Sequence, residues 1–367
     1  MKKNLIIITI DGARFDRAKH SKIYNKNNSV FLSQCITYGP HTIAAMHAIF
    51  SGSYGSRTGT NSYWSTYKFK KQEFHTLTEY LSEENYFTHA DIHSEIVIPK
   101  QGFDIFNVYD ENENLTLRHS KLLEKFSSEF KSKNFFLYLH YDKIHSGITE
   151  SVLKKFDNFS SEYFKNQENN KKNYDKLFYE SELYLEQIFN QLESLNLLKN
   201  SLVLVLSDHG ISVGEKFGER AYGAFCYDYT LKTFCYVYNS ELNSREVPNQ
   251  VRTVDFMPTI LELLQIPLKS NFQILDGESL IPLIKGEKYE EKIAFSETGN
   301  PLKENKPPKE PNTKSVRTSE WKLIYNTYDN TKELYNLQSD PDEKENLVGT
   351  NLEIEEILWL ELQKHMV

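Results

Sequence analysis

Three runs of apolar residues predict strands that are buried on both faces. They are continuous rather than alternating, which is typical of central strands in a parallel sheet. Polar residues follow each run, namely Asp11, Asp142, and Asp208 with His209. The runs are 4–10 (NLIIITI), 134–141 (NFFLYLHY) and 201–206 (SLVLVL). Because the carboxyl ends of such strands meet at one edge, the pattern predicts a ligand site there.

Between these runs, apolar residues at helical spacing predict helices. They cover 43–50, 75–82 and about 174–198. We expect the polar stretch 160–176 to be a solvated loop or the polar start of the long helix. The order of strands and helices therefore predicts an α/β fold, with a mostly parallel central sheet sandwiched by helices.

After Asp255 the pattern changes, and it predicts a small C-terminal α+β subdomain. The predicted elements are a helix over 256–265, an exposed loop over 299–314, strand pieces at 316–317 and 321–325, and a closing helix over 352–365. We therefore expect a main α/β domain over 1–289 and, over 290–367, a subdomain with a small antiparallel sheet and a closing helix.

Composition excludes several classes of protein. The 367 residues are 39% hydrophobic and 26% charged, which indicates a globular chain. A net charge of −8 with dispersed basic residues argues against a nucleic-acid partner. Three cysteines without metal-type spacing argue against a disulfide framework, and no apolar run approaches the ~20 residues of a membrane span. We expect a cytoplasmic protein. Its oligomeric state stays open, with a homo-oligomer as one alternative.

Asp11 and the Asp208-His209 pair are candidate ligands of a metal ion. A carboxylate beside an imidazole suits Mn, Fe or Zn better than Ca or Mg. Asp-Gly and His-Gly turns also occur without any function, so each motif alone is weak evidence. No HExxH pattern or cysteine cluster competes for the ion.

Thr42 follows a Gly-Pro-His segment and opens a predicted helix of small residues. As an N-cap it would need no further role. A hydroxyl at a helix N-terminus also faces free amides and the positive end of the dipole, where an anionic phosphoryl or sulfuryl group is stabilised. In contact with a metal, this hydroxyl could serve as a nucleophile.

Taken together and in order, these motifs resemble the alkaline phosphatase superfamily, specifically its sulfatase-like branch. The similar segments are IITIDGARFD, HTIAAMHAIFSG, FFLYLHYDKIH and VLVLSDHG, followed by VRTVDFMPTILELLQIP, DGESLIPLIKG, VRTSEWKLIY and ELYNLQSDPDEKENL. The resemblance implies Asp11, Asp208 and His209 as metal ligands. It implies Thr42 as ligand and nucleophile, and His145 as the group that binds substrate oxygens or protonates the leaving group.

Three departures from the family pattern bear on the chemistry. Thr42 stands where sulfatases carry a Cys or Ser that is converted to formylglycine within a C/S-x-P-x-R motif. A Thr at this position resembles the phosphodiesterase and phosphoglycerol-transferase members of the superfamily. Gly12 stands where calcium-binding sulfatases have a second Asp, which favours a single manganese ion, with Zn, Fe, Ca or Mg as alternatives. Tyr222 falls where many relatives have a basic residue.

Further residues could bind substrate or a second ion. Lys216 lies in a Gly-bounded loop and could contact an anionic substrate, as could Tyr222, although a solvated lysine is an equal alternative. Asp142, His140 and His145 could form part of a second metal site. The two-zinc members use an Asp-x-x-x-His arrangement that this sequence does not match, so one ion is expected.

The expected function is a metal-dependent phosphoester hydrolase, or phosphotransferase to an acceptor alcohol, acting through a covalent Thr42 intermediate. The substrate would be a phosphodiester, a phosphonate or phosphate monoester, on a small molecule or a glycan. One alternative is a sulfuric ester hydrolase that works without formylglycine. Another is a non-catalytic binding protein on the same scaffold.

Overall fold

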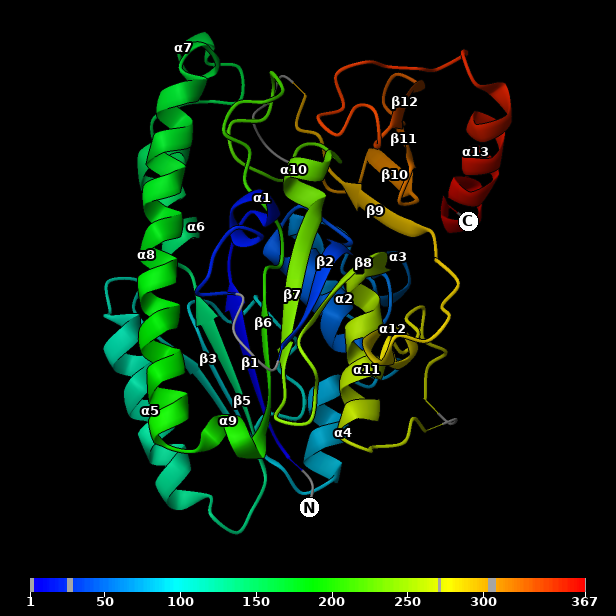
Figure 1. Ribbon diagram of the computed structural model, residues 1–367. Coiled ribbons are helices and arrows are strands. Elements are labelled where there is room, and N and C mark those ends of the chain that lie inside the picture. Colours follow the sequence, from blue (N-terminus) through cyan, green and yellow to red (C-terminus); the bar gives the residue numbers. More distant parts are fainter. Residues whose placement is uncertain (1–2, 25–28, 270–271, 303–307, 367) are drawn as a thin grey trace.

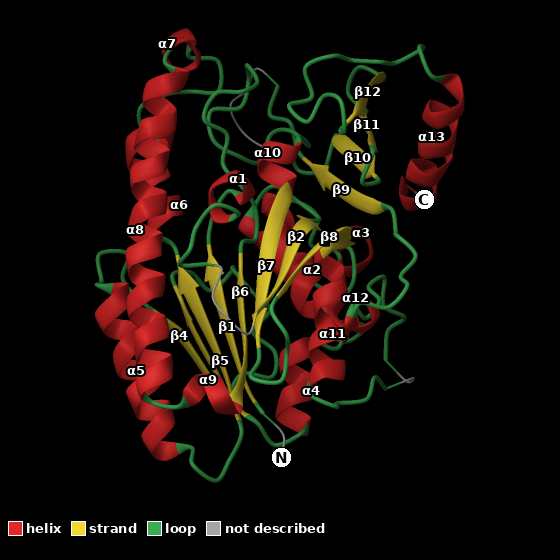
Figure 2. Ribbon diagram, viewed as in Figure 1, coloured by secondary structure: helices red, strands yellow, loops and turns green. Residues whose placement is uncertain are grey.

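The computed structural model describes residues 3–24, 29–269, 272–302 and 308–366. Its main feature is an eight-stranded sheet sandwiched between helices (Figures 1 and 2). β7 runs antiparallel to its neighbours β6 and β2, and the other described pairs in this sheet are parallel. In spatial order the strands are β4 (Ile105–Val108), β3 (Phe87–Ile92), β5 (Phe135–Tyr141), β1 (Asn4–Ile10), β6 (Ser201–Leu206), β7 (Lys232–Tyr238), β2 (Ser29–Ile36) and β8 (Arg245–Arg252).

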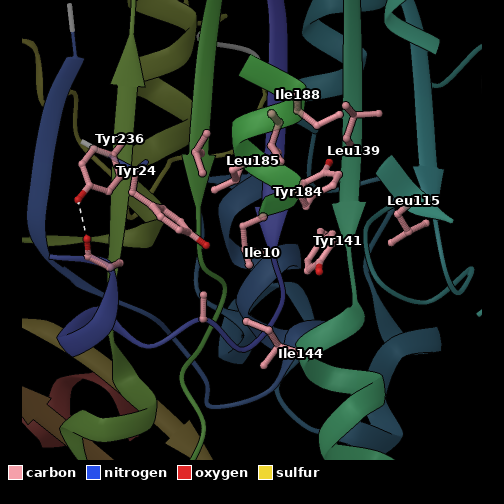
Figure 3. Packing of buried hydrophobic residues seen from close by; sticks show 14 of the residues in the cluster. Ile10, Tyr24, Leu115, Leu139, Tyr141, Ile144, Tyr184, Leu185, Ile188 and Tyr236 are labelled. Carbon is pink, nitrogen blue, oxygen red and sulfur yellow. Dashed lines mark hydrogen bonds between the residues drawn. The ribbon is translucent and has the colours of Figure 1, made fainter. Parts of the chain in front are cut away.

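The central strand β1 is apolar throughout because helices cover both of its faces. Ile6, Ile8 and Ile10 join one buried core, and Leu5 and Ile7 join the other. Successive side chains of a strand point to opposite faces, so a strand with two covered faces needs no polar positions. Figure 3 shows the first core, where side chains of the sheet meet those of α8.

Helices α5 and α8 cover the first face, and α2, α4 and α11 cover the second (Figure 1). The larger helices are α2 (Thr42–Ser51), α4 (Leu77–Glu83), α5 (Leu115–Glu129), α6 (Lys143–Ile148), α8 (Gln167–Ser194), α11 (Phe256–Leu263) and α13 (Leu352–Met366). The short ones are α1 (Phe15–Ala18), α3 (Gly55–Thr58), η1 (Tyr63–Lys68), η2 (Thr149–Leu153), α7 (Ser161–Lys165), α9 (Leu197–Asn200), α10 (Asp228–Leu231), η3 (Thr253–Asp255) and α12 (Ile281–Lys285).

A second, antiparallel sheet of four strands carries the C-terminal part of the chain, and α13 packs against it. Its spatial order is β12 (Thr331–Asn336), β11 (Trp321–Asn326), β10 (Thr313–Arg317) and β9 (Ala294–Thr298). Residues 303–307 of the predicted loop over 299–314 lie outside the described residues, and β10 begins within its last two positions.

The predicted fold class is confirmed, and the long helix needs a correction. α8 begins at Gln167 and ends at Ser194, rather than covering 174–198. The polar stretch before Tyr174 is therefore helical in part, because a helix on the surface tolerates polar residues along its exposed side. Asn196 adopts a left-handed conformation with φ 55°, which ends the helix before α9 begins.

A buried cluster of charged residues joins the two sheets. Asp228 lies 2.8 Å from Arg317 Nη2 and 2.9 Å from Lys322 Nζ, and Lys322 also lies 2.9 Å from Glu343. The side chain of Lys322 is fully buried and that of Arg317 is 3% exposed. The two cations therefore depend on these carboxylates for neutralisation.

We expect Asp228→Ala to lower the free energy of unfolding by about 3–5 kcal/mol, because it leaves two buried cations short of a partner. Urea unfolding followed by circular dichroism measures this loss. Glu150→Gln is the control, since Glu150 and Lys154 form an exposed pair whose removal should change stability by less than ~0.5 kcal/mol. Equal effects of the two substitutions would contradict the assigned role of Asp228.

Candidate metal and active site

Four neighbouring parallel strands bring polar residues to one edge of the large sheet. Asp11 follows β1 and Asp208 lies two residues after β6. His140 is in β5, paired with Thr9 of β1, and His93 follows β3. The site thus lies at the carboxyl ends of adjacent strands, where open α/β sheets bind ligands.

Asp11 is the centre of this group, and its side chain is fully buried. Its Oδ2 lies 3.2 Å from Thr42 Oγ1 and 3.1 Å from His140 Nε2. Its Oδ1 lies 3.4 Å from His145 Nδ1 and 3.6 Å from His209 Nε2. Side chains from four separate segments therefore converge on one carboxylate.

Asp208 and His209 complete the predicted ligand set beside Asp11. Asp208 accepts a hydrogen bond of 3.2 Å from the Gly12 amide, and its other oxygen lies 3.6 Å from His209 Nε2. His209 Nδ1 lies 2.8 Å from the Gly210 carbonyl. Donation to this carbonyl leaves the Nε2 lone pair directed at the other ligands, as metal-binding histidines require.

Thr42 is the first residue of α2, and its hydroxyl is directed into the site. The prediction that Thr42 could be the N-cap is wrong, because His41 takes that position and accepts a 3.4 Å hydrogen bond from the Ala44 amide. The Thr42 hydroxyl is thereby free of a capping role. It lies 3.3 Å from His209 Nε2 as well as near Asp11.

The buried charges of this site fit a divalent metal ion. Among the described residues, no Lys or Arg pairs with Asp11 or Asp208, and Asp11 Oδ1 and Asp208 Oδ2 are buried without a hydrogen-bond partner. Burial and the neighbouring Asp11 charge raise the pKa of Asp208. Burial acts in the same direction on Asp11, but His145 and His140 outweigh it and lower that pKa. Bound cations offset buried carboxylates of this kind.

His145 and Tyr222 form the accessible side of the site. His145, on α6, contacts Asp11 through Nδ1, and its Nε2 lies 3.3 Å from the Tyr222 hydroxyl. The Tyr222 ring lies 4.9 Å from the His209 ring, centroid to centroid. Burial lowers the pKa of His145, but the Asp11 carboxylate outweighs it and raises the pKa to about 9. The His145 side chain is 23% exposed, so substrate can reach the site from here.

The structure does not bring Lys216 to this group. Its ammonium group donates to the Glu343 carbonyl and lies 4.5 Å from the centre of the Tyr227 ring. These contacts connect the loop after β6 to the C-terminal part of the chain. The expected contact between Lys216 and substrate therefore has no support from the geometry.

His93 belongs to the cluster and was missed by the sequence analysis. Its ring lies 4.9 Å from that of His140 and 5.9 Å from that of His145. The signal that could have found it is a polar residue directly after the strand over 87–92. That strand has too little apolar character to stand out, since it reads FTHADI.

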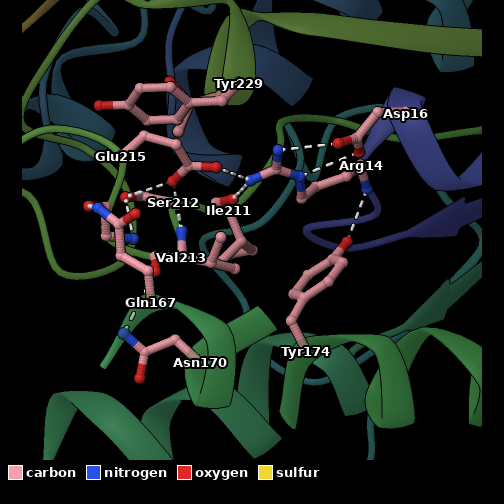
Figure 4. Close-up of polar contacts among 12 residues, drawn as sticks. Arg14, Asp16, Gln167, Asn170, Tyr174, Ile211, Ser212, Val213, Glu215 and Tyr229 are labelled. Atoms are coloured by element: carbon pink, nitrogen blue, oxygen red, sulfur yellow. Dashed lines mark hydrogen bonds and ion pairs between the residues drawn. The ribbon is translucent and has the colours of Figure 1, made fainter. Parts of the chain in front are cut away.

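Arg14 joins the two loops that carry the metal ligands (Figure 4). Its guanidinium group donates to the Ile211 carbonyl at 2.7 Å and pairs with Glu215 at 2.5 Å and Asp16 at 2.9 Å. On the other side, the Tyr174 hydroxyl of α8 accepts from the Arg14 amide at 2.7 Å and donates to the Gly12 carbonyl. Arg14 thus joins the loops after β1 and β6, and Tyr174 fixes the first of these loops to α8.

The chain belongs to the sulfatase family, whose model matches residues 3–266. A second model, described as N-sulphoglucosamine sulphohydrolase, C-terminal, matches residues 222–367. These matches confirm the predicted sulfatase-like family of hydrolases. Within the described residues, no helix has both the length and the apolar composition needed to cross a bilayer.

The chain is also similar to individual proteins and to solved structures. The chain is 29% identical to arylsulfatase K of Rattus norvegicus in an alignment of 247 residues. This alignment covers 60% of this chain and 41% of the rat protein. The match thus spans less than half of that relative. A solved structure in complex with its substrate D-glucosamine-2-N,6-O-disulfate has a TM-score of 0.76 at 15% identity, covering 99% of this chain and 97% of the other. The phosphonate monoester hydrolase of Agrobacterium radiobacter has a TM-score of 0.76 at 13% identity, covering 99% and 96%.

Glu219, in the loop that carries Tyr222, makes the free energy of unfolding depend on pH. It is buried and accepts hydrogen bonds from the Ala224 and Phe225 amides and the Tyr229 hydroxyl. Burial raises its pKa from 4.5 to about 7 despite these donors. Between these values the unfolded chain binds fewer protons than the folded one at this group, so its contribution to stability decreases as pH rises.

We therefore expect the free energy of unfolding of the wild type, relative to Glu219→Gln, to fall between pH 4.5 and 7. Urea unfolding at several pH values measures this difference. Glu150→Gln, an exposed substitution, measured over the same pH range controls for the general effect of replacing a glutamate by glutamine. A constant difference for Glu219→Gln would contradict the raised pKa.

Proposed function

We propose that the protein is a metal-dependent hydrolase of an anionic ester, with the Thr42 hydroxyl as the nucleophile. One observation carries the proposal. Thr42 Oγ1 lies at the N-terminus of α2 within 3.2–3.3 Å of Asp11 and His209, in a site of buried, uncompensated carboxylates. A hydroxyl so placed has neighbouring groups that can activate it and backbone amides that can stabilise an anionic centre.

Asp11, Asp208 and His209, with Thr42, would hold one divalent metal ion. We propose Mn²⁺, with Zn, Fe, Ca or Mg as alternatives, because two carboxylates with one imidazole suit a transition metal. When bound, the ion supplies a Lewis acid that lowers the pKa of a neighbouring hydroxyl and neutralises charge on the substrate. The Gly12 amide and the Gly210 carbonyl keep Asp208 and His209 in place for this role.

The protein's own groups account for both halves of the reaction. Thr42 Oγ1 gives up its proton to solvent and attacks the central atom of the ester, the bond to the leaving oxygen breaks, and a covalent ester of Thr42 forms. His145 lies on the accessible side of the site, and in its protonated form it can give a proton to the leaving oxygen. Water, losing a proton to the now neutral His145, then attacks the central atom, the bond to Thr42 Oγ1 breaks, and Thr42 regains a proton from solvent as the acid leaves. An acceptor alcohol in place of water would give group transfer.

Two substrate classes are consistent with this site, and each has its own support. The sulfatase family match and the arylsulfatase K relatives favour a sulfuric ester. Thr42 favours a phosphoester or phosphonate ester, because threonine cannot supply the aldehyde of formylglycine and Met46 stands where the sulfatase motif has Arg. Likeness to the phosphonate monoester hydrolase supports the second class more weakly, since it shows the fold alone.

We further propose a glycan-linked or small-molecule substrate and a cytoplasmic location. The neighbouring structure with a disulfated glucosamine supports an anionic sugar ester as the substrate class. Cys35, Cys226 and Cys235 are free and buried, which fits a reducing compartment.

A panel of p-nitrophenyl substrates tests the proposal. It contains the sulfate, the phosphate, the phenylphosphonate and bis-p-nitrophenyl phosphate. We expect the purified protein with Mn²⁺ to hydrolyse at least one of them. Thr42→Ala and Asp208→Asn should lower kcat/KM about 10²–10³-fold or more, because each removes a group that acts on the transition state.

Two further variants make this test sharper. Thr42→Ser keeps the hydroxyl and should retain more activity than Thr42→Val, which keeps the shape alone. Thr327→Val, in the C-terminal subdomain, is the matched control and should leave kcat/KM unchanged. Wild-type activity in Thr42→Val would contradict a Thr42 nucleophile. Preference for the sulfate or for the phosphorus esters decides between the two classes.

A further inference from the structure

A second group of ligand atoms lies on the opposite side of Asp11 from Asp208. It consists of Asp11, His93 and His140, whose ligand atoms all lie within 4.8 Å of one another. Two ligands of one ion at ~2.1 Å are at most ~4.2 Å apart, so small side-chain movements would bring all three to one ion. From this group we propose a second divalent-metal site, with Asp11 as the carboxylate shared between two ions.

Each oxygen of Asp11 faces a different histidine, and Oδ2 also lies 3.2 Å from Thr42 Oγ1 of the first group. Oδ2 lies 3.1 Å from His140 Nε2, and Oδ1 lies 3.6 Å from His209 Nε2. Both His140 Nε2 and Oδ2 can lie about 2.1 Å from one ion if they subtend an angle of about 95° at it, which is ordinary metal geometry. One ion can therefore bind on each side of the carboxylate.

The hydrogen bonds of the two histidines suit metal ligation. His140 Nδ1 lies 3.0 Å from the Tyr138 hydroxyl, and donation to that oxygen leaves the Nε2 lone pair directed at Asp11. An ion between His140 Nε2 and Asp11 would select this tautomer, with Nδ1 donating to Tyr138 and Nε2 binding the metal. His93 Nδ1 is buried without a hydrogen-bond partner, although the residue is half-buried overall.

This set differs from the one considered from the sequence. Asp142 accepts a 3.2 Å hydrogen bond from the Tyr109 hydroxyl, and none of its hydrogen bonds or ion pairs among the described residues is to His93 or His140. Asp142, His140 and His145 are therefore not the group that the structure brings together. Asp11 and His93 take the places that were assigned to Asp142 and His145.

A second ion would also supply charge that the site lacks. Tyr222 and Met46 stand where relatives carry basic side chains, and Lys216 is bound to the C-terminal part of the chain. Two divalent ions against Asp11 and Asp208 leave a net positive site for an anionic ester. The role of the second metal site in binding an anionic ester rests on the proposed function. Whether an ion binds there depends only on Asp11, His93 and His140.

Counting metal ions on the purified 367-residue protein without substrate tests this site. The protein is stripped with chelator, titrated with Zn²⁺ or Mn²⁺ by calorimetry, and its bound metal is measured by mass spectrometry after gel filtration. We expect two equivalents in the wild type and one in each of His93→Ala and His140→Asn. Asp208→Asn should also lose one equivalent, from the other site.

His89→Gln is the matched control, because His89 is a buried histidine of β3, the strand that His93 follows, and packs on Phe126. It should keep two equivalents, and unfolding curves confirm that each variant is folded. His93→Ala is the more informative variant if His140→Asn does not fold, since His93 is closer to the surface.

Two results would overturn the second site. One is a single equivalent in the wild type that Asp208→Asn removes. The other is a His93→Ala protein with two equivalents but weakened binding of inorganic phosphate, which would make the histidines an anion site. Either result leaves the proposed function standing, because the reaction is read from the Thr42 and Asp208 variants with substrate. If the Thr42 and Asp208 variants lose activity while the wild type binds only one equivalent of metal, the proposed function stands and the second metal site is overturned.

Discussion

The buried carboxylate of Asp11 is the constraint on which the rest of the site depends. It lies at the end of the central strand, fully removed from water, and no Lys or Arg of the described chain neutralises it. An ionised carboxylate in this position is costly unless a cation and hydrogen-bond donors compensate it. Thr42, His140, His145 and His209 all approach it within 3.6 Å.

The fold satisfies this constraint by assembling the site before any ligand binds. Parallel pairing of β3, β5, β1 and β6 places their carboxyl ends side by side, and Asp11, His93, Asp208 and His209 lie within three residues of those ends. The loops after β1 and β6 are joined through Arg14, while α2 presents Thr42 from the other sheet face. Rigid elements rather than long loops therefore position the reacting groups, as catalytic geometry requires.

Much of this arrangement could be predicted from sequence, because the informative residues follow strongly apolar strands. The runs that end before Asp11 and Asp208 are continuous and β-branched, so their ends were predictable to within a residue. The strand before His93 has alternating polar residues and lies between β4 and β5 near the sheet edge, and its pattern was too weak to locate it. The role of Lys216 depends on where the C-terminal sheet docks, which is a tertiary contact that local pattern does not encode.

The most direct test of the central claim is a crystal structure from crystals grown with Mn²⁺ or Zn²⁺, with data collected on both sides of the metal absorption edge. We predict an anomalous difference peak within coordinating distance of Asp11, Asp208 and His209, and a second peak between Asp11, His93 and His140. A structure with strong anomalous peaks elsewhere and none within coordinating distance of Asp11 would contradict the account.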